Sequence, residues 1–503
     1  MLRVAVLAML LLAAAPARAQ EAPSDLPDTP VARVFRAWLR AINAGDSASA
    51  REFALQHEAR NPEDTAGVRR AIRDVLMEGR DIRGSRIEQW RAQSPEQLEI
   101  VLLFPDGARR VLTFAVSLVG EAWRVAWKTL VPARGQQSQP PGPPQAQPAG
   151  PPAAQGPAAG EPLPAGLSDA ALADSVAARL TARSAAGLFD GAVLLARLDG
   201  AVLLRRAWGT ADRRTNAPNT PETGYTLAST GKMFTSIAVA QLVEQGRVAL
   251  DSPLIRYVPD YPNQDFARRA TIRHLLSHTS GLGHYWGPEY GARRRSLLTP
   301  ADHLPLFANN APSFAPGERF QYSNAGFMVL GLVIERVSGM SFYDFIQRNI
   351  FDRAGMRHTG YYPASGETPA GVATGYSPAG GSGSLTPNDT IRELRGGPAG
   401  GGYSTVDDMM RFAQALGDGR LVRRETLAQW TSGQSDNGRT GFGFMVLNQG
   451  RGRAFGHSGG APGMGTWLLV YPELGLVEVA LTNRDPNLLS WIQQPLMRAL
   501  AAR

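Results

Sequence analysis

Thirty residues near the end of the first third of the chain restrict how everything around them can fold. Residues 135–164 read GQQSQPPGPPQAQPAGPPAAQGPAAGEPLP and consist almost wholly of proline, glutamine, glycine and alanine. A segment of this composition has no apolar periodicity and cannot bury a core, so we expect an extended linker. The chain must then fold as separate units on either side of the linker, which we place at residues 27–133 and 167–503.

The N-terminus has the pattern of an export signal. Arg3 precedes an apolar run at residues 4–15, and Ala17-Arg18-Ala19 has the small-x-small form of a cleavage site. That run is too short to span a bilayer, and no later apolar run approaches the roughly 20 residues of a membrane-spanning helix. We therefore expect residues 1–19 to be a signal peptide cleaved after Ala19, a periplasmic or secreted protein, and no stable membrane insertion after cleavage.

Composition excludes some chemistries and draws attention to one residue type. The 52 basic and 44 acidic residues give a net charge of +8, spread along the chain without a Lys/Arg-rich block, so we expect no nucleic-acid partner. The absence of cysteine excludes disulfides, a thiolate nucleophile and a Cys-ligated metal. Only two of the basic residues are lysines, Lys128 and Lys232. Because an ammonium can lose its proton where a guanidinium cannot, a surviving lysine indicates a role that arginine does not fill.

The first unit is predicted to be a small α+β domain. Residues 31–43 have apolar side chains at helical spacing, and a second helical stretch follows at about residues 68–76. Strand-like runs come next, at residues 98–104, 109–118 and 122–130, with a turn at Asp106-Gly107. Helices followed by an antiparallel sheet resemble the NTF2-like fold. With no catalytic constellation in it, we interpret this unit as an accessory or binding module.

The second unit has strands at both of its ends. A helix at about residues 167–185 precedes a hairpin at residues 191–209, whose turn is Asp199-Gly200. Another hairpin at residues 466–484 is followed by a helix from about Leu488. Strands that enclose a long helical middle predict an α+β domain whose terminal strands share one antiparallel sheet.

One segment of this unit carries chemistry. In TLASTGKMFTSIAVAQLVEQG, at residues 226–246, the part after Lys232 is apolar nearly all round, which predicts a fully buried helix. Ser229 and Lys232 stand three residues apart, so one helical turn places both side chains on one face. Desolvation lowers the pKa of such a lysine toward the range of a general base. The alternative is an N-cap serine with a snorkelling lysine, which the scarcity of lysine disfavours.

Ser-x-x-Lys is the acylation motif of serine β-lactamases and penicillin-binding proteins, and residues 167–503 resemble that superfamily. Tyr322-Ser323-Asn324 resembles its second motif, Tyr-x-Asn. His457-Ser458-Gly459 resembles its third, which is usually Lys-Thr-Gly and in some members His-x-Gly. Residues 272–282 and 400–416 also resemble the branch that contains class C β-lactamases, D-peptidases and esterases. The resemblance implies an α+β fold of an antiparallel sheet flanked by helices, together with a helical region.

Three lookalike motifs compete with these assignments. Tyr261-Pro262-Asn263 lies between prolines and suits a turn, and His358-Thr359-Gly360 resembles a structural segment of the family. Residues 456–460, GHSGG, satisfy the Gly-x-Ser-x-Gly elbow of α/β-hydrolases, with Ser458 as the nucleophile. That fold needs a histidine after the serine and a helix after the elbow. No histidine follows His457 in the chain, and a strand is predicted instead.

Metal and phosphate sites are not predicted. His274 and His278 share a helical face and His284 follows, but no HExxH motif is present, so we expect a buried histidine bonded to the turn at residues 279–281. The glycine-rich residues 378–385 lack the Lys-Ser/Thr of a phosphate loop and predict a surface loop. We expect no metal and no cofactor.

The resemblance implies a role for each matching residue. Ser229 attacks a carbonyl and Lys232 accepts its proton, while Tyr322 relays that proton to the leaving group and later activates water. Asn324 positions the substrate amide and the lysine. His457, on an edge strand, lines the opposite wall.

The remaining assignments concern the third motif. Ser458 and Gly459 are expected to position substrate beside His457. The oxyanion is expected between the backbone amides of Ser229 and Gly460.

The histidine of the third motif bears on the substrate. A lysine there supplies a permanent charge for a substrate carboxylate, whereas histidine is mostly neutral at pH 7. We therefore favour an esterase or D-peptidase over a true class C-like β-lactamase, acting on a small-molecule or peptide substrate for which the cell wall is one source. The further alternative is a non-catalytic protein that binds peptidoglycan or a partner. The oligomeric state is left open.

Overall fold

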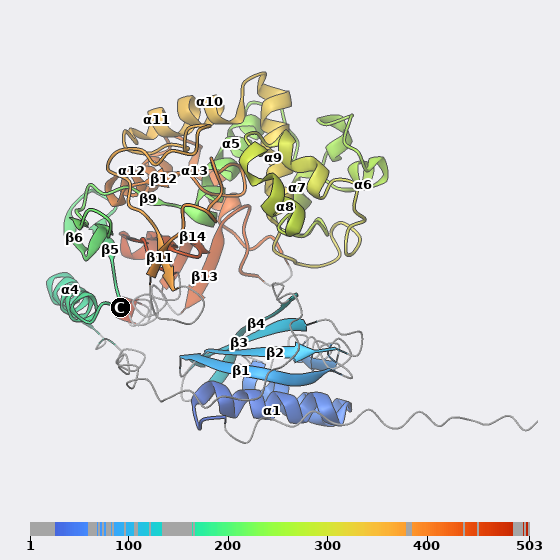
Figure 1. Ribbon diagram of the computed structural model, residues 1–503. Coiled ribbons are helices and arrows are strands. Elements are labelled where there is room, and N and C mark those ends of the chain that lie inside the picture. Colours follow the sequence, from blue (N-terminus) through green and yellow to red (C-terminus); the bar gives the residue numbers. More distant parts are fainter. Residues whose placement is uncertain are drawn as a thin grey trace, which may run out of the picture. The chain divides into compact units, whose positions relative to one another are not determined.

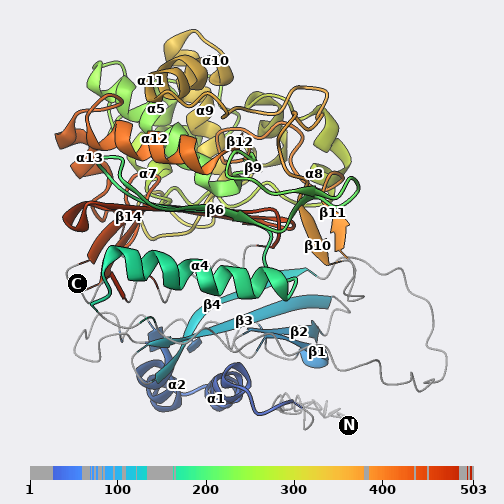
Figure 2. The ribbon, with the colours of Figure 1, turned by 90° about the vertical axis from the view of Figure 1, so that its left-hand side faces the viewer.

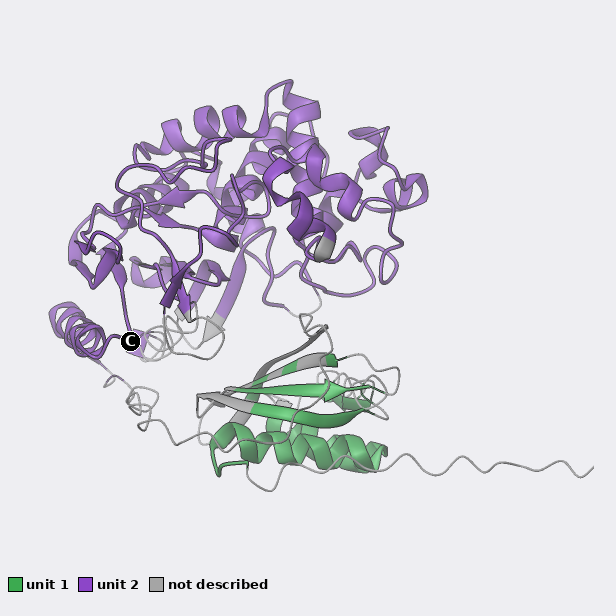
Figure 3. Cartoon of the chain, in the orientation of Figure 1, with its two compact units in different colours: residues 1–153 green, residues 154–503 purple. Residues whose placement is uncertain are grey.

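The chain forms two compact units, residues 1–153 and residues 154–503 (Figure 3). The computed structural model describes residues 26–58, 85–94, 97–104, 109–119, 122–132, 166–378, 385–435, 438–449 and 452–485, together with isolated residues within 68–82, Leu163 and three residues within 496–500. The predicted signal peptide, nearly all of the predicted linker, the Asp106-Gly107 turn and residues 379–384 of the glycine-rich stretch lie outside these residues. So does most of the C-terminal helix expected from Leu488.

The first unit packs a long helix on a four-stranded sheet. Helix α1, Pro30–Ala44, begins where the Thr29 hydroxyl accepts a hydrogen bond from the Ala32 amide, and it ends at Gly45, whose positive φ of 66° forms a left-handed cap. Helix α2, Ser47–Phe53, and a π turn at Ala54–Glu58 follow. The sheet is antiparallel in the order β1-β2-β3-β4, with bounds Arg86–Ser94, Gln97–Leu103, Arg109–Val119 and Ala122–Pro132.

Helix α1 buries the apolar face that its sequence predicts. Phe35 and Trp38 are each 1% exposed, and their rings lie 5.7 and 5.5 Å from that of Phe114 on β3. Aromatic pairs at this separation add to the burial of apolar area that holds helix and sheet together. The described residues of the second predicted helix, at 68–76, are helical.

The second unit is built on a six-stranded antiparallel sheet in the order β13-β14-β15-β16-β5-β6. Its strands are β5 Gly191–Arg197, β6 Val202–Trp208, β13 Met445–Gln449, β14 Gly452–Ala461, β15 Met464–Tyr471 and β16 Leu476–Thr482. Strand β16 pairs with β5, from Leu476 opposite Arg197 to Thr482 opposite Gly191. The two ends of the unit therefore share one sheet, as the sequence predicts (Figure 1).

Helices cover both faces of this sheet (Figure 2). On one face, helix α4, Asp169–Ala185, packs its Leu172, Val176 and Leu180 against strand residues that include Leu469. On the other face lie helices α5, Lys232–Glu244, and α12, Val406–Gly417, with the helical region beyond them. We call these the α4 face and the helical face.

The helical region is centred on two buried helices. Helix α5 packs on α9, Asn324–Ser338, and from Asn324 to Ile334 every residue of α9 is buried. In the described part of this unit, the other helices and helical turns with defined bounds are η2 Ala228–Gly231, η3 Leu254–Arg256, α6 Gln264–Arg269, α7 Ile272–Leu276, α8 Pro288–Arg293, η4 Arg294–Ser296, η5 Ala301–Leu306, α10 Phe342–Ile346, η6 Gln347–Phe351, α11 Asp352–Ala354, α13 Arg424–Trp430 and η7 Pro472–Leu474. Short strands are β7 Thr210–Asp212, β8 Ala217–Pro218, β9 Tyr225–Thr226, β10 Tyr376–Pro378, β11 Leu385–Pro387 and β12 Tyr403–Ser404.

Within the described part of the chain, no single helix is long and apolar enough to cross a membrane. Helix α9 and the helical stretch Phe342–Ala354 pass that test only as a pair, bent by 80° at the break between them.

Candidate active site

Ser229 lies on a strained turn at the start of the buried helix α5. It belongs to the 3₁₀ turn η2, and Lys232 is the first residue of α5. In a 3₁₀ turn, side chains three residues apart are nearly eclipsed, so the Ser229 hydroxyl stands over the lysine. Ala228, immediately before, has a φ of 46°, a conformation that costs a non-glycine residue about 1–2 kcal/mol. Strain of this kind is common where a chain presents a functional side chain.

Lys232 is completely buried and donates three hydrogen bonds. Its Nζ lies 3.2 Å from the Ser229 Oγ and 2.6 Å from the Asn324 Oδ1, and it also donates to the carbonyl oxygen of Ala399. The predicted contact between Ser229 and Lys232 is therefore present in the structure. All three partners are acceptors, so each of the three N–H groups of the ammonium has a hydrogen-bond partner.

Lys232 loses its proton more readily than an exposed lysine does. Burial lowers its pKa to about 7, and the negative charge of Glu393 opposes that shift. The Tyr322 and Phe327 ring centroids lie 4.8 and 5.5 Å from Nζ and also favour the cation. An amine with this pKa exchanges protons readily near neutral pH.

Tyr322 and Asn324 come from the start of α9. The Ser323 hydroxyl caps the helix by accepting a hydrogen bond from the Gly326 amide at 2.8 Å, which sets the two flanking side chains toward Lys232. Burial raises the pKa of Tyr322, and the nearby Ser229 hydroxyl offsets part of the rise. The Tyr322 hydroxyl makes no hydrogen bond of good geometry to any described residue.

Behind Tyr322 lies His278, one of the three histidines among which the sequence predicts a buried ring bonded to the turn at residues 279–281. The His278 ring stacks on Tyr322 with centroids 4.4 Å apart, and its Nδ1 accepts a hydrogen bond from the Ser323 amide at 3.0 Å. The expected bond to the turn at residues 279–281 is replaced because the ring reaches α9 instead. His278 has a φ of 58°, and burial lowers its pKa, so the neutral ring acts as a rigid backing for Tyr322.

A second aromatic segment reaches the site from residues 284–286. The Asn324 Nδ2 lies 3.1 Å from the Nδ1 of His284, whose ring is parallel to that of Trp286 at 5.1 Å. Tyr285, between them, is buried and donates to the Glu393 Oε1 at 2.7 Å. The sequence motifs predict no role for this segment.

Strand β14 forms the opposite wall. Pairing with β13 ends at Gly456, so β14 continues from His457 to Ala461 without that neighbour. Strand β14 is second in the order of the sheet, next to β13, but the part of β14 that carries His457 extends beyond the end of β13, as the expected edge position requires. Burial lowers the pKa of His457 to about 3, helped by the charge of Lys232, so the ring is neutral.

Alternation along β14 separates the residues of the third motif. His457 lies opposite Leu468, whose side chain belongs to the core of the helical face, while Ser458 lies opposite Trp467, which belongs to the α4 face. The Ser458 hydroxyl accordingly contacts the Met445 Sδ at 3.4 Å. The expectation that the Ser458 side chain positions substrate is therefore corrected, because successive strand residues point to opposite faces.

Gly459 is in close contact with the serine turn. A Cβ built on Gly459 would lie 2.3 Å from the Leu227 carbonyl oxygen and 2.9 Å from the Ser229 amide nitrogen. Only glycine permits this approach. It brings the strand that carries Gly460 alongside the Ser229 amide, as an oxyanion site between the two amides requires.

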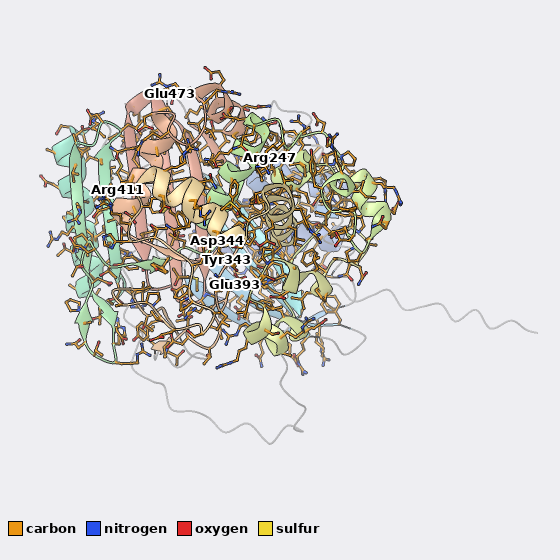
Figure 4. All side chains as sticks on the ribbon, turned by 90° about the horizontal axis from the view of Figure 1, so that it is seen from above. Arg247, Tyr343, Asp344, Glu393, Arg411 and Glu473 are labelled. Carbon is orange, nitrogen blue, oxygen red and sulfur yellow. The ribbon has the colours of Figure 1, made fainter. Side chains whose placement is uncertain are left out.

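Residues 393–399 contribute two further groups that act on Lys232, a carbonyl acceptor and a negative charge. The Ala399 carbonyl accepts one of its N–H groups, and Glu393, labelled in Figure 4, is the acidic group whose charge acts on it. Sequence analysis recognised residues 400–416 as family-like, but it missed both of these groups.

The competing motifs have structural roles. Tyr261 is a core residue that precedes α6, and the Thr359 hydroxyl donates to Asp408. Ser458 lies within a strand and not at a strand-to-helix turn, which is inconsistent with a nucleophile elbow. The His274 ring caps its own helix by accepting from the Thr271 amide at 3.2 Å. In the part of the chain that the structure describes, no group of three or more His, Asp or Glu side chains could hold a metal.

This chain is similar in sequence and in structure to several known proteins. A sequence model of the Beta-lactamase family matches residues 176–503. Penicillin-binding protein 4* of Bacillus subtilis (strain 168) is 32% identical over 316 residues, covering 59% of this chain and 69% of the relative. Esterase EstB of Burkholderia gladioli is 31% identical over 291 residues, covering 51% of this chain and 74% of the relative. The crystal structure of a penicillin binding protein from Bacillus halodurans aligns with a TM-score of 0.58 at 31% identity, covering 64% of this chain and 98% of that chain.

Proposed function

Because this chain belongs to the beta-lactamase family, we propose that it is a serine hydrolase that forms an acyl-enzyme on Ser229. The observation that carries the proposal is the arrangement at Lys232. A fully buried amine with a pKa of about 7 has its Nζ 3.2 Å from a half-buried serine hydroxyl at the start of a helix. A nucleophile beside a base of this strength is the basis of covalent catalysis.

The partners of Lys232 indicate how the proton moves. Asn324 and Ala399 each accept one N–H, so the amine lone pair of the neutral lysine is left to face the Ser229 hydroxyl. Lys232 takes the proton as Ser229 Oγ bonds to the substrate carbonyl carbon, and the three acceptors then hold the ammonium. Tyr322, beside both groups, passes a proton to the leaving group as the carbonyl re-forms.

The negative charge that develops on the substrate carbonyl oxygen must be stabilised by hydrogen-bond donors. We assign the Ser229 and Gly460 backbone amides to this role, since Gly459 brings β14 against the Ser229 amide. Tyr322, which lost its proton to the leaving group, then takes a proton from the water that attacks the acyl carbon. As the bond between that carbon and the Ser229 Oγ breaks, the Lys232 ammonium returns a proton to the serine oxygen.

The wall at His457 favours an uncharged substrate. The His457 Nδ1 is hydrogen-bonded to the Ser458 carbonyl, so the neutral ring carries its proton on Nδ1. It therefore offers no fixed positive charge to a substrate carboxylate. We therefore infer an ester or a D-amino-acid amide as substrate in preference to a β-lactam carboxylate. The likeness to an esterase supports this choice. The likeness to a penicillin-binding protein keeps a penicillin adduct as the second candidate.

Two further proposals concern the rest of the chain. The pattern of residues 1–19 supports export with cleavage after Ala19, which predicts a mature N-terminus at Gln20 in the periplasmic or extracellular fraction. A long helix on a four-stranded antiparallel sheet supports an NTF2-like accessory module at residues 27–133.

Intact-mass spectrometry with acylating probes tests the function. A fluorophosphonate is expected to add once to the wild-type chain and not to Ser229→Ala, which also loses hydrolysis of a chromogenic ester. Ser458→Ala, on the α4 face, is the matched control and should label normally. Absence of labelling in the wild type, or loss of labelling in Ser458→Ala alone, would contradict the assignment. Penicillin that is turned over without an adduct would favour the β-lactamase alternative.

A further inference from the structure

Two threonine hydroxyls lie beneath the serine turn and have no part in the mechanism above. Thr230 follows Ser229, and Thr466 lies on β15; their side chains are 0% and 1% exposed. The two Oγ1 atoms are 2.6 Å apart, and the Thr466 Oγ1 is 2.6 Å from the carbonyl oxygen of Leu227. Because buried hydroxyls need partners, these bonds define one arrangement and exclude others.

The direction of the bonds follows from the atoms. A carbonyl oxygen only accepts, so Thr466 donates its single hydroxyl proton to Leu227. Thr230 must then donate to Thr466. The Thr230 amide also donates to the Leu227 carbonyl at 3.2 Å, which closes a compact ring of bonds around the turn.

These contacts bracket the strained part of the turn. Leu227 precedes Ala228, whose φ is 46°, and Thr230 follows Ser229. One hydroxyl on the sheet therefore holds the backbone before Ala228 and the side chain after Ser229. A strained residue persists only where its surroundings hold it from more than one side.

The same hydroxyl touches the strand that forms the opposite wall. Thr466 pairs with Gly459 across β14 and β15, and a Cβ on Gly459 would lie 2.4 Å from the Thr466 Oγ1. Gly460 is the next residue. Thr466 thus contacts both the turn that carries the Ser229 amide and the strand that carries the Gly460 amide.

We propose that Thr466, acting with Thr230, is a positioning residue that sets the separation of the two oxyanion amides. This inference rests on the proposed function, because it assumes that those amides stabilise an oxyanion. Donors of this kind act only when they are held within a few tenths of an ångström of the position that the charge will occupy.

The test compares Thr466→Val with Thr466→Ser in the full chain. Valine keeps the shape and β-branching and removes the hydroxyl, whereas serine keeps the hydroxyl. With a p-nitrophenyl ester, Thr466→Val is expected to lose about 10- to 100-fold in kcat with KM changed less than about threefold, because the ground state does not use the oxyanion amides. Thr466→Ser should stay within about threefold of the wild type. Phenylboronic acid, which carries an oxygen into the oxyanion site, should bind Thr466→Val more weakly in the same proportion.

The matched control is Thr482→Val. Thr482 is also a buried strand threonine whose hydroxyl donates to a backbone carbonyl, that of Asp190, and it should keep the wild-type kcat. If Thr466→Val does not fold, Thr230→Val is the second test. It removes the hydrogen bond from Thr230 to Thr466 and leaves the bond from Thr466 to the Leu227 carbonyl in place. A smaller loss of kcat is expected for it.

The outcomes separate the two proposals. A wild type that no fluorophosphonate labels overturns the proposed function. A wild type labelled at Ser229 together with unchanged kcat in Thr466→Val overturns only the positioning role. Equal losses in Thr466→Val and Thr466→Ser would also overturn it, because the methyl packing and not the hydroxyl would then matter.

Discussion

The sheet of the second unit has a completely buried ionisable group on each face. Lys232 is 0% exposed on the helical face, and Glu478, on β16, is 1% exposed on the α4 face. Burial disfavours the charge of both groups: it lowers the pKa of Lys232 to about 7 and raises the pKa of Glu478 to about 8. By pKa alone, both would be candidates for a functional site.

The partners of the two groups differ. Lys232 has three acceptors, one of which is the Ser229 hydroxyl on a strained turn. Glu478 accepts a hydrogen bond from the Tyr471 hydroxyl at 3.2 Å, and its other oxygen has no partner of good geometry among the described residues. A shifted pKa therefore reports burial, and catalysis additionally needs a reacting group, such as the Ser229 hydroxyl, within reach of the shifted group.

Lys232→Arg should break the site with the largest effect. Arginine keeps the charge and nearly the length but cannot accept the Ser229 proton, so acylation by a chromogenic ester is expected to fall by roughly 10²–10⁴-fold in stopped-flow measurements. Lys128→Arg, in the first unit, is the control and should acylate at the wild-type rate. A folded Lys232→Arg chain with normal acylation would remove the lysine from the mechanism.

Glu478→Gln should change stability and leave chemistry intact. The pKa of Glu478 is raised on folding, so its contribution to stability is fully present below its unfolded pKa of about 4.5 and is lost progressively as the pH rises to about 8. Glutamine cannot ionise. We therefore expect the variant to be more stable than the wild type at pH 8, by about 1–3 kcal/mol in denaturant unfolding, with little advantage at pH 4.

The wild-type ester hydrolysis rate should be unchanged in Glu478→Gln at neutral pH. Lost activity in a stable variant would show that the α4 face also serves the reaction, and the contrast between the two faces would fail.

Glu393→Gln should sharpen the assignment of Lys232 as the base. The negative charge of Glu393 raises the pKa of Lys232 against the effect of burial, so its removal makes the neutral lysine available at lower pH. The acidic limb of the pH profile of kcat/KM, expected near pH 7 in the wild type, should move down by about half a pH unit or more.

Asp389→Asn is the matched control for Glu393→Gln. Asp389 lies four residues earlier on the same segment and pairs with Arg214 at 3.1 Å. Its variant should keep the wild-type profile. A limb that stays in place in Glu393→Gln would mean that another group is the titrating base.

Removal of residues 1–160 should have the smallest effect. Among the described residues, the members of the two cores of the second unit all come from Leu163 onward, and Leu163 itself is 6% exposed in the core of the α4 face. We expect the shortened chain to fold and to hydrolyse a small soluble ester within about threefold of the full-chain rate. Insolubility or lost activity would show that the first unit completes the fold or the site.

The sequence predicted the contacts that follow from local spacing and the pairing that follows from the order of the strands along the chain. The contact of Ser229 with Lys232 follows from a separation of three in a helical turn, and the burial of α5 follows from its apolar pattern. The pairing of the terminal strands was predicted from their positions at the two ends of the unit. Alternation along a strand could also have separated Ser458 from His457, but it was not applied to the third motif.

The groups that sequence analysis missed act across long stretches of chain. The Ala399 carbonyl is a main-chain atom like any other, and its role at Lys232 depends on a fold that brings residues 167 apart in sequence into contact. His278 stacks on Tyr322 for the same reason, and Thr466 meets Leu227 across 239 residues. No periodicity or motif encodes such approaches, because they depend on how buried helices and a twisted sheet pack together.

Residue types and their order along the chain define which chemistry is available: a Ser-x-x-Lys pair, a single lysine in the second unit, and the absence of any thiol. These are properties of residue identity and local spacing. The 3₁₀ turn and the start of α5 place Ser229 and Lys232 in contact because the two residues are three apart. Which of the ionisable groups can act depends on the tertiary structure. It surrounded Lys232 with acceptors and a nucleophile, and it placed Glu478 in the core of the α4 face with the Tyr471 hydroxyl as its donor. It also turned His457 toward the site and Ser458 away. Desolvation and hydrogen-bond geometry are set by packing between distant segments, so residue identity names the candidates and the fold selects among them.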